Sequence, residues 1–152
     1  MKEAVVAYIR NDEGKFLLLY HVNQDYWTPP GGKVEPDDWN TRESICREVF
    51  EEVNYDVMQI KDWTPQVHCN KVTTTITHEC GDENWILHLY YIPFYNEFKD
   101  KLINNEPEKH SSMKWFSIEE IEKLPKVSYS VKLLLGMYKC FDEYIIHSNT
   151  RD

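Results

Sequence analysis

Hydrophobic and polar positions alternate along two segments near the start of the chain, residues 4–10 and 15–21, as expected of strands. The intervening Asn-Asp-Glu-Gly at 11–14 has the composition of a tight turn, so the two segments predict a β-hairpin. Residues 85–95 are apolar on both alternating faces. That pattern predicts a strand buried on both sides.

Helical periodicity replaces the alternation over residues 40–53. Asn40 is a suitable N-cap, and Glu43 three positions later completes a capping-box pattern. The apolar positions that share one face are Ile45, Cys46, Val49 and Val53. We therefore expect an amphipathic helix anchored on a core by this face.

The remainder of the chain predicts further strands and two more helices. Segments 56–63 and 67–79 are strand candidates, the second rich in Thr and Val. The polar stretch 96–112 is long for an internal connection. A short strand then leads into a helix capped by Ser117, and a last helix spans about residues 129–146.

The elements alternate between strand and helix, and we find no internal repeat or linker. This order predicts one α/β domain over residues 1–152, with residues 148–152 as a frayed tail. A chain of 152 residues is long enough to bury a sizeable core.

The balance of charge restricts the partners. There are 26 acidic and 17 basic residues, a formal charge of -9, which argues against a nucleic-acid polymer as the main partner. No apolar run approaches the roughly 20 residues needed to span a bilayer, and the N-terminus resembles a first strand more than a signal peptide. The four cysteines lack CxxC spacing, and Cys46 is expected as a small buried thiol. We therefore expect a cytoplasmic protein without membrane contact.

The face of helix 40–53 opposite its apolar residues carries ionisable side chains. Helical spacing gathers Arg47, Glu48, Glu51 and Glu52 on one arc. Like charges this close destabilise a helix, so a divalent cation is a natural partner. Oxygen ligands suit magnesium, manganese or calcium. The alternative is that this face is only solvated surface, as most Glu-rich helix faces are.

The loop before this helix, residues 26–38, favours a cation site over a merely solvated surface. Gly31 and Gly32 allow close approach of the backbone to a ligand, and Pro29 and Pro30 stiffen the chain before them. A rigid glycine-rich loop that leads into a carboxylate-lined helix can hold a metal-bound phosphate group between backbone and cation.

In these residues the chain resembles the Nudix hydrolase family, whose box reads GX5EX7REUXEEXGU with U aliphatic. The matching residues are Gly32, Arg47, Glu48, Val49, Glu51 and Glu52. Three departures occur at the ends of the motif. Asp38 replaces the first glutamate, the interval from Asp38 to Arg47 is one residue longer, and Asn54-Tyr55 replaces the final glycine and aliphatic residue. Asn is the residue after glycine that best tolerates a left-handed C-cap.

The resemblance implies an α/β/α sandwich with a mixed central sheet, in which the box forms a loop-helix-loop. It implies a hydrolase of phosphoric anhydride bonds that uses Mg²⁺, for which Mn²⁺ can substitute. The implied metal ligands are Glu48, Glu51, Glu52 and the carbonyl of Gly31. Arg47 is expected to orient the glutamates, and the general base is a box glutamate or an acid of the later loop, Glu106 or Glu108.

The substrate is less defined by the sequence. Gly32, Lys33 and Trp27 are candidate contacts, and Tyr26, Trp39 and Trp85 are further aromatic residues that could stack on a base. The proline and tyrosine that often mark ADP-ribose and dinucleoside polyphosphate specificity in the family are replaced by Asn70 and Lys71.

We therefore favour a nucleoside triphosphate, including oxidised ones, cleaved to monophosphate and pyrophosphate. ADP-ribose, a dinucleoside polyphosphate or FAD are the alternatives within the family. A catalytically inactive module that senses nucleotides or binds a partner is the alternative of another class. An isoprenoid diphosphate isomerase would require more than the lone His68-Cys69 pair. An oligomer is possible.

Overall fold

A computed structural model describes residues 2–61 and 69–138. Within these residues, seven strands form one mixed sheet in the order β3-β2-β1-β6-β5, with β4 paired to β1 and β7 paired to β2. The strands are β1 (Lys2–Arg10), β2 (Phe16–His21), β3 (Tyr26–Thr28), β4 (Gly31–Lys33), β5 (Cys69–His78), β6 (Gly81–Pro93) and β7 (His110–Phe116). The helices are α1 (Thr41–Val53), α2 (Ile118–Glu122), the 3₁₀ helices η1 (Val57–Gln59) and η2 (Asn96–Lys101), and a helix described over residues 129–138.

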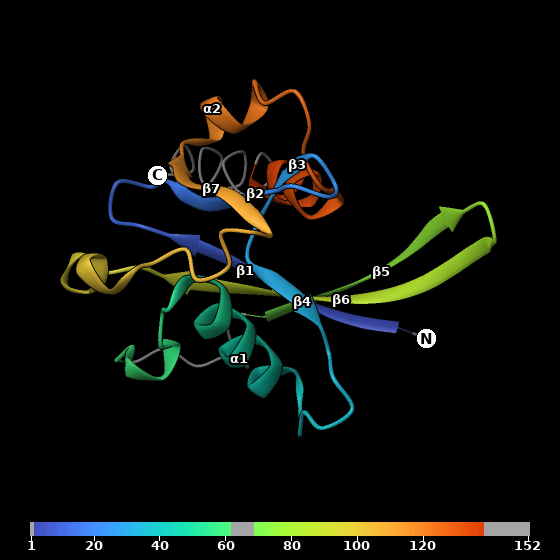
Figure 1. Ribbon diagram of the computed structural model, residues 1–152, viewed down its shortest axis with the longest axis horizontal. Coiled ribbons are helices and arrows are strands. Elements are labelled where there is room, and N and C mark those ends of the chain that lie inside the picture. Colours follow the sequence, from blue (N-terminus) through green and yellow to red (C-terminus); the bar gives the residue numbers. More distant parts are fainter. Residues whose placement is uncertain (1, 62–68, 139–152) are drawn as a thin grey trace, which may run out of the picture.

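Strand β1 lies at the centre of the sheet and divides the core into two layers. Its Val5, Ala7 and Ile9 belong to the cluster under α1, whereas Val6 and Tyr8 belong to the cluster on the opposite face. It pairs with β6 in parallel along its whole length. Figure 1 shows α1 on one face of the sheet and α2 with helix 129–138 on the other. The predicted α/β/α arrangement around a mixed sheet is therefore confirmed.

Helix α1 forms as the apolar spacing predicts. Ile45, Val49 and Val53 are fully buried against the sheet. The Asn40 side chain accepts a hydrogen bond from the Glu43 amide at 2.9 Å, which confirms the N-cap. The Glu43 carboxylate reaches the amide of residue 39 at 2.8 Å instead of the Asn40 amide, so the capping box is displaced by one residue. Cys46, expected to be buried, is half-buried.

The first two strands form, but the predicted hairpin pairs only next to its turn, at Arg10 and Phe16. Beyond that point β1 pairs with β4 and β6, while β2 pairs with β3 and β7. Strand β6 begins earlier than residue 85 and is buried on both sides as predicted, with Leu89 in one cluster and Tyr90 in the other.

The prediction of a strand over residues 56–63 is wrong where the structure describes it. The Asp56 side chain accepts a hydrogen bond from the Met58 amide at 3.1 Å and caps the short helix η1. Val57 and Ile60, three residues apart, are both buried. This spacing suits a 3₁₀ turn, in which residues i and i+3 face the same way. Residues 62 and 63 lie outside the described residues.

The C-terminal half follows the sequence more closely. Ser117 and Glu120 form the predicted capping box, with the two side chains bonded reciprocally to the two amides at 3.1 and 3.0 Å. The connection predicted over 96–112 is shorter, because it contains η2 and β7 already begins at His110. Residues 139–146 of the last helix and the tail 148–152 lie outside the described residues. No helix among the described residues is long and apolar enough to cross a membrane.

Candidate active site

Strand β4 begins with two glycines that lie close to the backbone of β1 on one side and to carboxylates of α1 on the other. A side chain at Gly32 would overlap the carboxylate of Glu48. The Gly31 amide donates a hydrogen bond to Oε1 of Glu52 at 3.1 Å. On its other side Gly31 lies against β1, where an added Cβ would overlap the Val5 carbonyl oxygen. The glycines therefore bring the loop within contact of two carboxylates of α1.

The three box glutamates of α1, Glu48, Glu51 and Glu52, differ in their exposure. Glu48 is 9% exposed and Glu52 only 2% exposed, whereas Glu51 faces solvent. Burial raises the pKa of Glu52, and the charge of Glu48 raises it further. Burial also raises the pKa of Glu48, although the Arg47 guanidinium opposes this. Two buried carboxyl groups side by side are stabilised in their charged form by a cation, so the arrangement fits a divalent metal ion.

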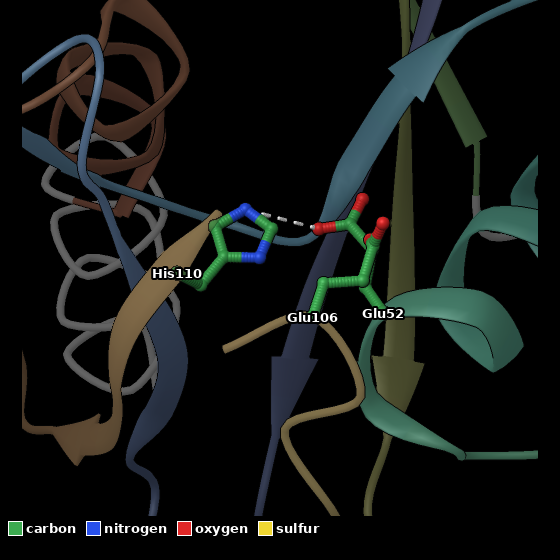
Figure 2. A group of neighbouring side chains, drawn as sticks. All are labelled: Glu52, Glu106 and His110. Atoms are coloured by element: carbon green, nitrogen blue, oxygen red, sulfur yellow. Dashed lines mark ion pairs between the residues drawn. The ribbon is translucent and has the colours of Figure 1, made fainter. Parts of the chain in front are cut away.

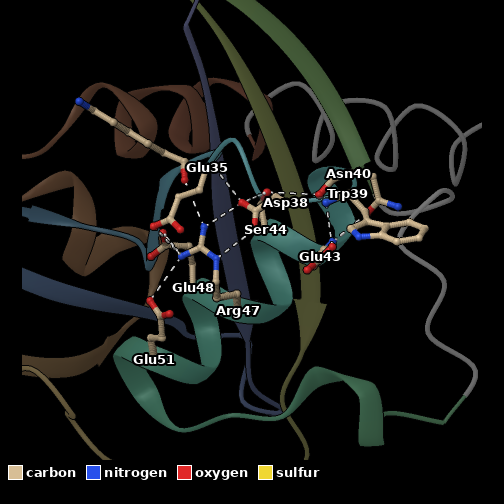
Figure 3. A network of polar contacts seen from close by, with 10 residues as sticks. Glu35, Asp38, Trp39, Asn40, Glu43, Ser44, Arg47, Glu48 and Glu51 are labelled. Atoms are coloured by element: carbon tan, nitrogen blue, oxygen red, sulfur yellow. Dashed lines mark hydrogen bonds and ion pairs between the residues drawn. The ribbon is translucent and has the colours of Figure 1, made fainter.

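Arg47 connects the helix to the preceding loop (Figure 3). Its guanidinium donates to Asp38 through Nε and Nη2, at 3.2 and 2.9 Å. Nη1 donates to Glu48 at 3.0 Å and to Glu51 at 3.4 Å. The same nitrogen lies 3.4 Å from a carboxylate oxygen of Glu35. Arg47 therefore bonds to two of the three box glutamates, Glu48 and Glu51, which lie on its own arc of the helix.

Two further side chains, those of Glu106 and His110, lie next to the Glu52 carboxylate. The loop after η2 covers the C-terminal end of α1, where the Asn105 amide donates to the Glu52 carbonyl at 3.0 Å. This connection brings Glu106 next to the Glu52 carboxylate, and β7 brings in His110 (Figure 2). One carboxylate oxygen of Glu52 lies 3.6 Å from Nε2 of His110. Burial lowers the pKa of His110 to about 4, so its ring is neutral near neutral pH.

The opposite face of β4 borders a shallow cavity of about 460 Å³. The ammonium groups of Lys33 and Lys2 lie 5.7 and 5.5 Å from the ring centre of Trp85, within cation–π range. Lys2 is also paired with Glu83 at 3.1 Å. Among the residues that the structure describes, Lys33 forms no ion pair.

The family comparison agrees with this geometry. The model of the NUDIX domain matches residues 1–135 of the chain. The chain belongs to the Nudix family. The prediction of a Nudix hydrolase is thereby confirmed at the level of the family. No curated protein gave a significant sequence match.

Several solved structures share the Nudix fold at low sequence identity. A MutT protein from Methanosarcina mazei Go1 has a TM-score of 0.70 and 22% identity, covering 93% of this chain and 94% of that one. An Ap4A hydrolase from C. elegans, in a binary complex, has a TM-score of 0.65 and 20% identity, covering 93% and 97%. The NUDIX domain of NrtR from Shewanella oneidensis, complexed with ADP ribose, has a TM-score of 0.62 and 14% identity, covering 90% and 85%. These likenesses establish the fold alone.

The departures from the Nudix box are accommodated locally. Asp38 reaches Arg47 despite its shorter side chain and the additional residue between them. Asn54 adopts the left-handed conformation at the helix end, with φ 61° and ψ 27°, and its side chain donates to the carbonyl of Lys101 at 2.8 Å. The structure therefore retains the loop-helix-loop although both ends of its sequence motif differ.

The predicted site residues are brought together only in part. Glu48, Glu51 and Glu52 lie near one another, and of the two loop acids Glu106 reaches Glu52 whereas Glu108 is exposed. Gly31 meets Glu52 through its amide, so the role of its carbonyl oxygen stays a prediction.

The aromatic residues that were expected to contact a nucleotide base differ in their surroundings. Trp27 packs edge-on against Tyr20 and Phe116 in the core layer opposite α1. Trp39 is 91% exposed, and Trp85 borders the cavity beside Lys33. The structure thus gives Trp27 aromatic packing partners in the core and places Trp85 beside Lys33 of the box loop.

His110 was not among the residues expected from the sequence. It lies next to Glu52 because β7 pairs with β2 and the turn before β7 folds back onto itself, with the His110 amide donating to the Glu106 carbonyl at 2.8 Å. The only sequence signal is its spacing of four residues from Glu106, which is uninformative in a loop.

Proposed function

We propose that this chain is a Mg²⁺-dependent Nudix pyrophosphohydrolase that cleaves the diphosphate linkage of a small nucleotide. The observation that carries the proposal is the placement of Glu48 and Glu52, two buried carboxyl groups pressed against Gly31 and Gly32. Of this pair, Arg47 offsets the charge of Glu48 alone, so burying both carboxylates is unfavourable, whereas a divalent ion bound to a diphosphate would balance the pair.

The carboxylates of Glu48, Glu51 and Glu52 would hold the ion. Bound Mg²⁺ supplies charge neutralisation at the diphosphate and lowers the pKa of the attacking water. Arg47 keeps Glu48 and Glu51 in position through its Nη1 hydrogen bonds of 3.0 and 3.4 Å. This contact leaves the guanidinium occupied by carboxylates, so its contribution is to orient the ligands.

Glu106 is the better placed of the two loop acids to accept the proton of the attacking water. Its carboxylate lies beside Glu52 and is half-buried, whereas the side chain of Glu108 is exposed. A general base must lie within hydrogen-bond reach of the water, directly or through one other water. The position of Glu106 at the edge of the carboxylate group favours it for this role, and a box glutamate is the alternative.

The substrate class we favour is a nucleoside triphosphate, including oxidised forms, cleaved to monophosphate and pyrophosphate. This choice rests on the sequence, which has Asn70 and Lys71 in place of the markers of the other classes, and the cavity beside β4 offers Lys33 and Trp85 to the phosphates and the base of any of these nucleotides. ADP-ribose, dinucleoside polyphosphates and FAD are the alternatives, since an Ap4A hydrolase and an ADP-ribose-bound domain share the fold.

The compartment we propose is the cytoplasm. Cys46 and Cys80 are free thiols, in keeping with the reducing conditions there.

A substrate panel tests this proposal. Phosphate release would be measured with Mg²⁺, using pyrophosphatase for triphosphates and alkaline phosphatase for ADP-ribose, dinucleoside polyphosphates and FAD. We expect metal-dependent turnover of one class, strongly reduced by Glu51→Gln. A folded protein that binds a nucleotide but hydrolyses none of the panel would instead indicate a nucleotide-sensing module.

A further inference from the structure

His110 is an imidazole buried beside two acids, and one of its ring nitrogens has no hydrogen-bond partner. Its side chain is 2% exposed, and Nδ1 has no hydrogen-bond partner. Nε2 lies 3.6 Å from the nearest oxygen of Glu52, too far for a hydrogen bond. Leaving a buried polar atom unpaired costs about 1–3 kcal/mol. A ligand bound by Nδ1 would remove this cost.

The neighbouring acids provide the rest of a coordination site. One ligand atom each from Glu52, Glu106 and His110 lie within 4.8 Å of one another. Donor atoms at roughly 2.1 Å from a shared cation are up to roughly 4 Å apart, so small side-chain rotations suffice. Figure 2 shows that the ring edge carrying both nitrogens faces the two carboxylates.

The backbone holds these three residues firmly. The Asn105 amide bonds to the carbonyl of Glu52 at 3.0 Å, and the His110 amide bonds to the carbonyl of Glu106 at 2.8 Å. The Asn104 side chain donates to the His110 carbonyl at 2.7 Å. The end of α1, the turn before β7 and the start of β7 therefore form one connected unit around the three side chains.

We propose that His110 is a nitrogen ligand of a divalent-cation site completed by Glu52 and Glu106, and that this site prefers Mn²⁺ or Co²⁺ over Mg²⁺. An imidazole nitrogen is a softer donor than a carboxylate or water oxygen, and affinity for it rises along the first transition series. Mg²⁺ instead favours oxygen ligands and retains its waters. The inference rests on the proposed function in that Glu52 is shared with the box ligands, and where Glu106 binds the ion the general base is a box glutamate instead.

The alternative is that His110 only positions Glu52 through a hydrogen bond and never contacts the ion. The two roles differ in one observable, which is direct coordination of nitrogen. Pulsed EPR of bound Mn²⁺ detects the ¹⁴N nucleus of a coordinated imidazole, and it does so without turnover.

The test uses the full chain loaded with Mn²⁺ and no nucleotide. We expect ¹⁴N modulation in the wild type, its replacement by ¹⁵N modulation when histidine is labelled, and its loss in His110→Gln. The affinity for Mn²⁺ should fall about tenfold or more in His110→Gln and Glu106→Gln, with little change for Mg²⁺ in His110→Gln. His88→Gln, at a buried histidine paired with Glu3, and Glu108→Gln, at the exposed acid of the same loop, should bind Mn²⁺ like the wild type.

Mn²⁺ that binds without nitrogen modulation in the wild type would overturn the inference, as would unchanged modulation in a folded His110→Gln variant. The labelling experiment needs no substitution, so a variant that fails to fold does not leave the question open. Neither result would affect the proposed hydrolysis, which fails separately if Glu51→Gln retains full Mg²⁺-dependent turnover.

Discussion

The carboxylate of Asp38 accepts a hydrogen bond at each oxygen from the guanidinium of Arg47, from Nε at 3.2 Å and from Nη2 at 2.9 Å. It also accepts from the Ser44 hydroxyl at 2.7 Å and from the Glu35 amide at 2.9 Å. One short acid thus joins the loop before α1 to the first two turns of the helix. This explains how the box tolerates Asp38 and one additional residue before Arg47.

Asp38→Asn should lower stability by about 2 kcal/mol at neutral pH, because the charge-assisted bonds to Arg47 are lost. Those bonds hold the pKa of Asp38 well below its usual 3.8. A depressed pKa contributes stability above the usual value and loses it as the pH falls below that value. Urea unfolding of wild type and variant should therefore differ most at neutral pH and converge in acid. An equal difference in unfolding free energy at every pH would show that the charge of Asp38 is not the source of the stability.

Gly32→Ala should disable the site while leaving the fold largely intact. The added Cβ would occupy the position of the Glu48 carboxylate, so the carboxylate must move away from the loop. We expect weaker Mg²⁺ binding by calorimetry and a corresponding loss of turnover. Gly136→Ala is the matched control, since nothing lies within 4 Å of a Cβ added there. It should stabilise its helix by about 1 kcal/mol and leave metal binding unchanged.

Glu52→Gln should stabilise the protein when a chelator is present. Burial raises the pKa of Glu52, so its contribution to stability is complete below its usual value and is lost as the pH rises through the raised value. Wild type in EDTA should thus melt at lower temperature near pH 8 than near pH 5, and the variant should be less sensitive. Mg²⁺ at about 100 times its Kd should restore about 2.7 kcal/mol to the wild type alone. Equal stabilisation of both proteins would mean that Mg²⁺ binds elsewhere.

Asn54→Ala should cost about 1 kcal/mol or more of unfolding free energy, because alanine is strained at φ 61° and loses the side-chain bond to Lys101. Asn54→Gly should lose only the side-chain bond, since glycine adopts this conformation readily. Thermal melts of the two variants separate backbone strain from the hydrogen bond. If glycine were the more damaging change, the backbone would not be the dominant factor.

Local patterns identified the parts of the fold that local chemistry determines. Helix α1 and its caps followed from Asn40, its apolar spacing and Asn54, and the strand buried on both sides followed from the apolar run that includes Leu89. The short helix η1 was missed because a side-chain bond from Asp56 outweighs a sequence pattern that favours a strand.

Contacts between segments that are distant in the sequence could not be predicted from local patterns. The parallel pairing of β1 with β6 has no local signal, and the meeting of His110 with Glu52 depends on where β7 lies beside β2. Glu106 and Glu108 are equivalent in sequence terms, and only the turn before β7 distinguishes them.

The most direct test of the account compares kcat for the preferred substrate in Mg²⁺ among wild type, Glu52→Gln and Glu119→Gln, with folding checked by circular dichroism. Glu119 is exposed on α2 and controls for the loss of one negative charge. The account predicts that Glu52→Gln loses at least about 100-fold in kcat, because metal stabilisation of the transition state is worth several kcal/mol, while Glu119→Gln is unaffected. A folded Glu52→Gln enzyme with wild-type, Mg²⁺-dependent turnover would contradict it.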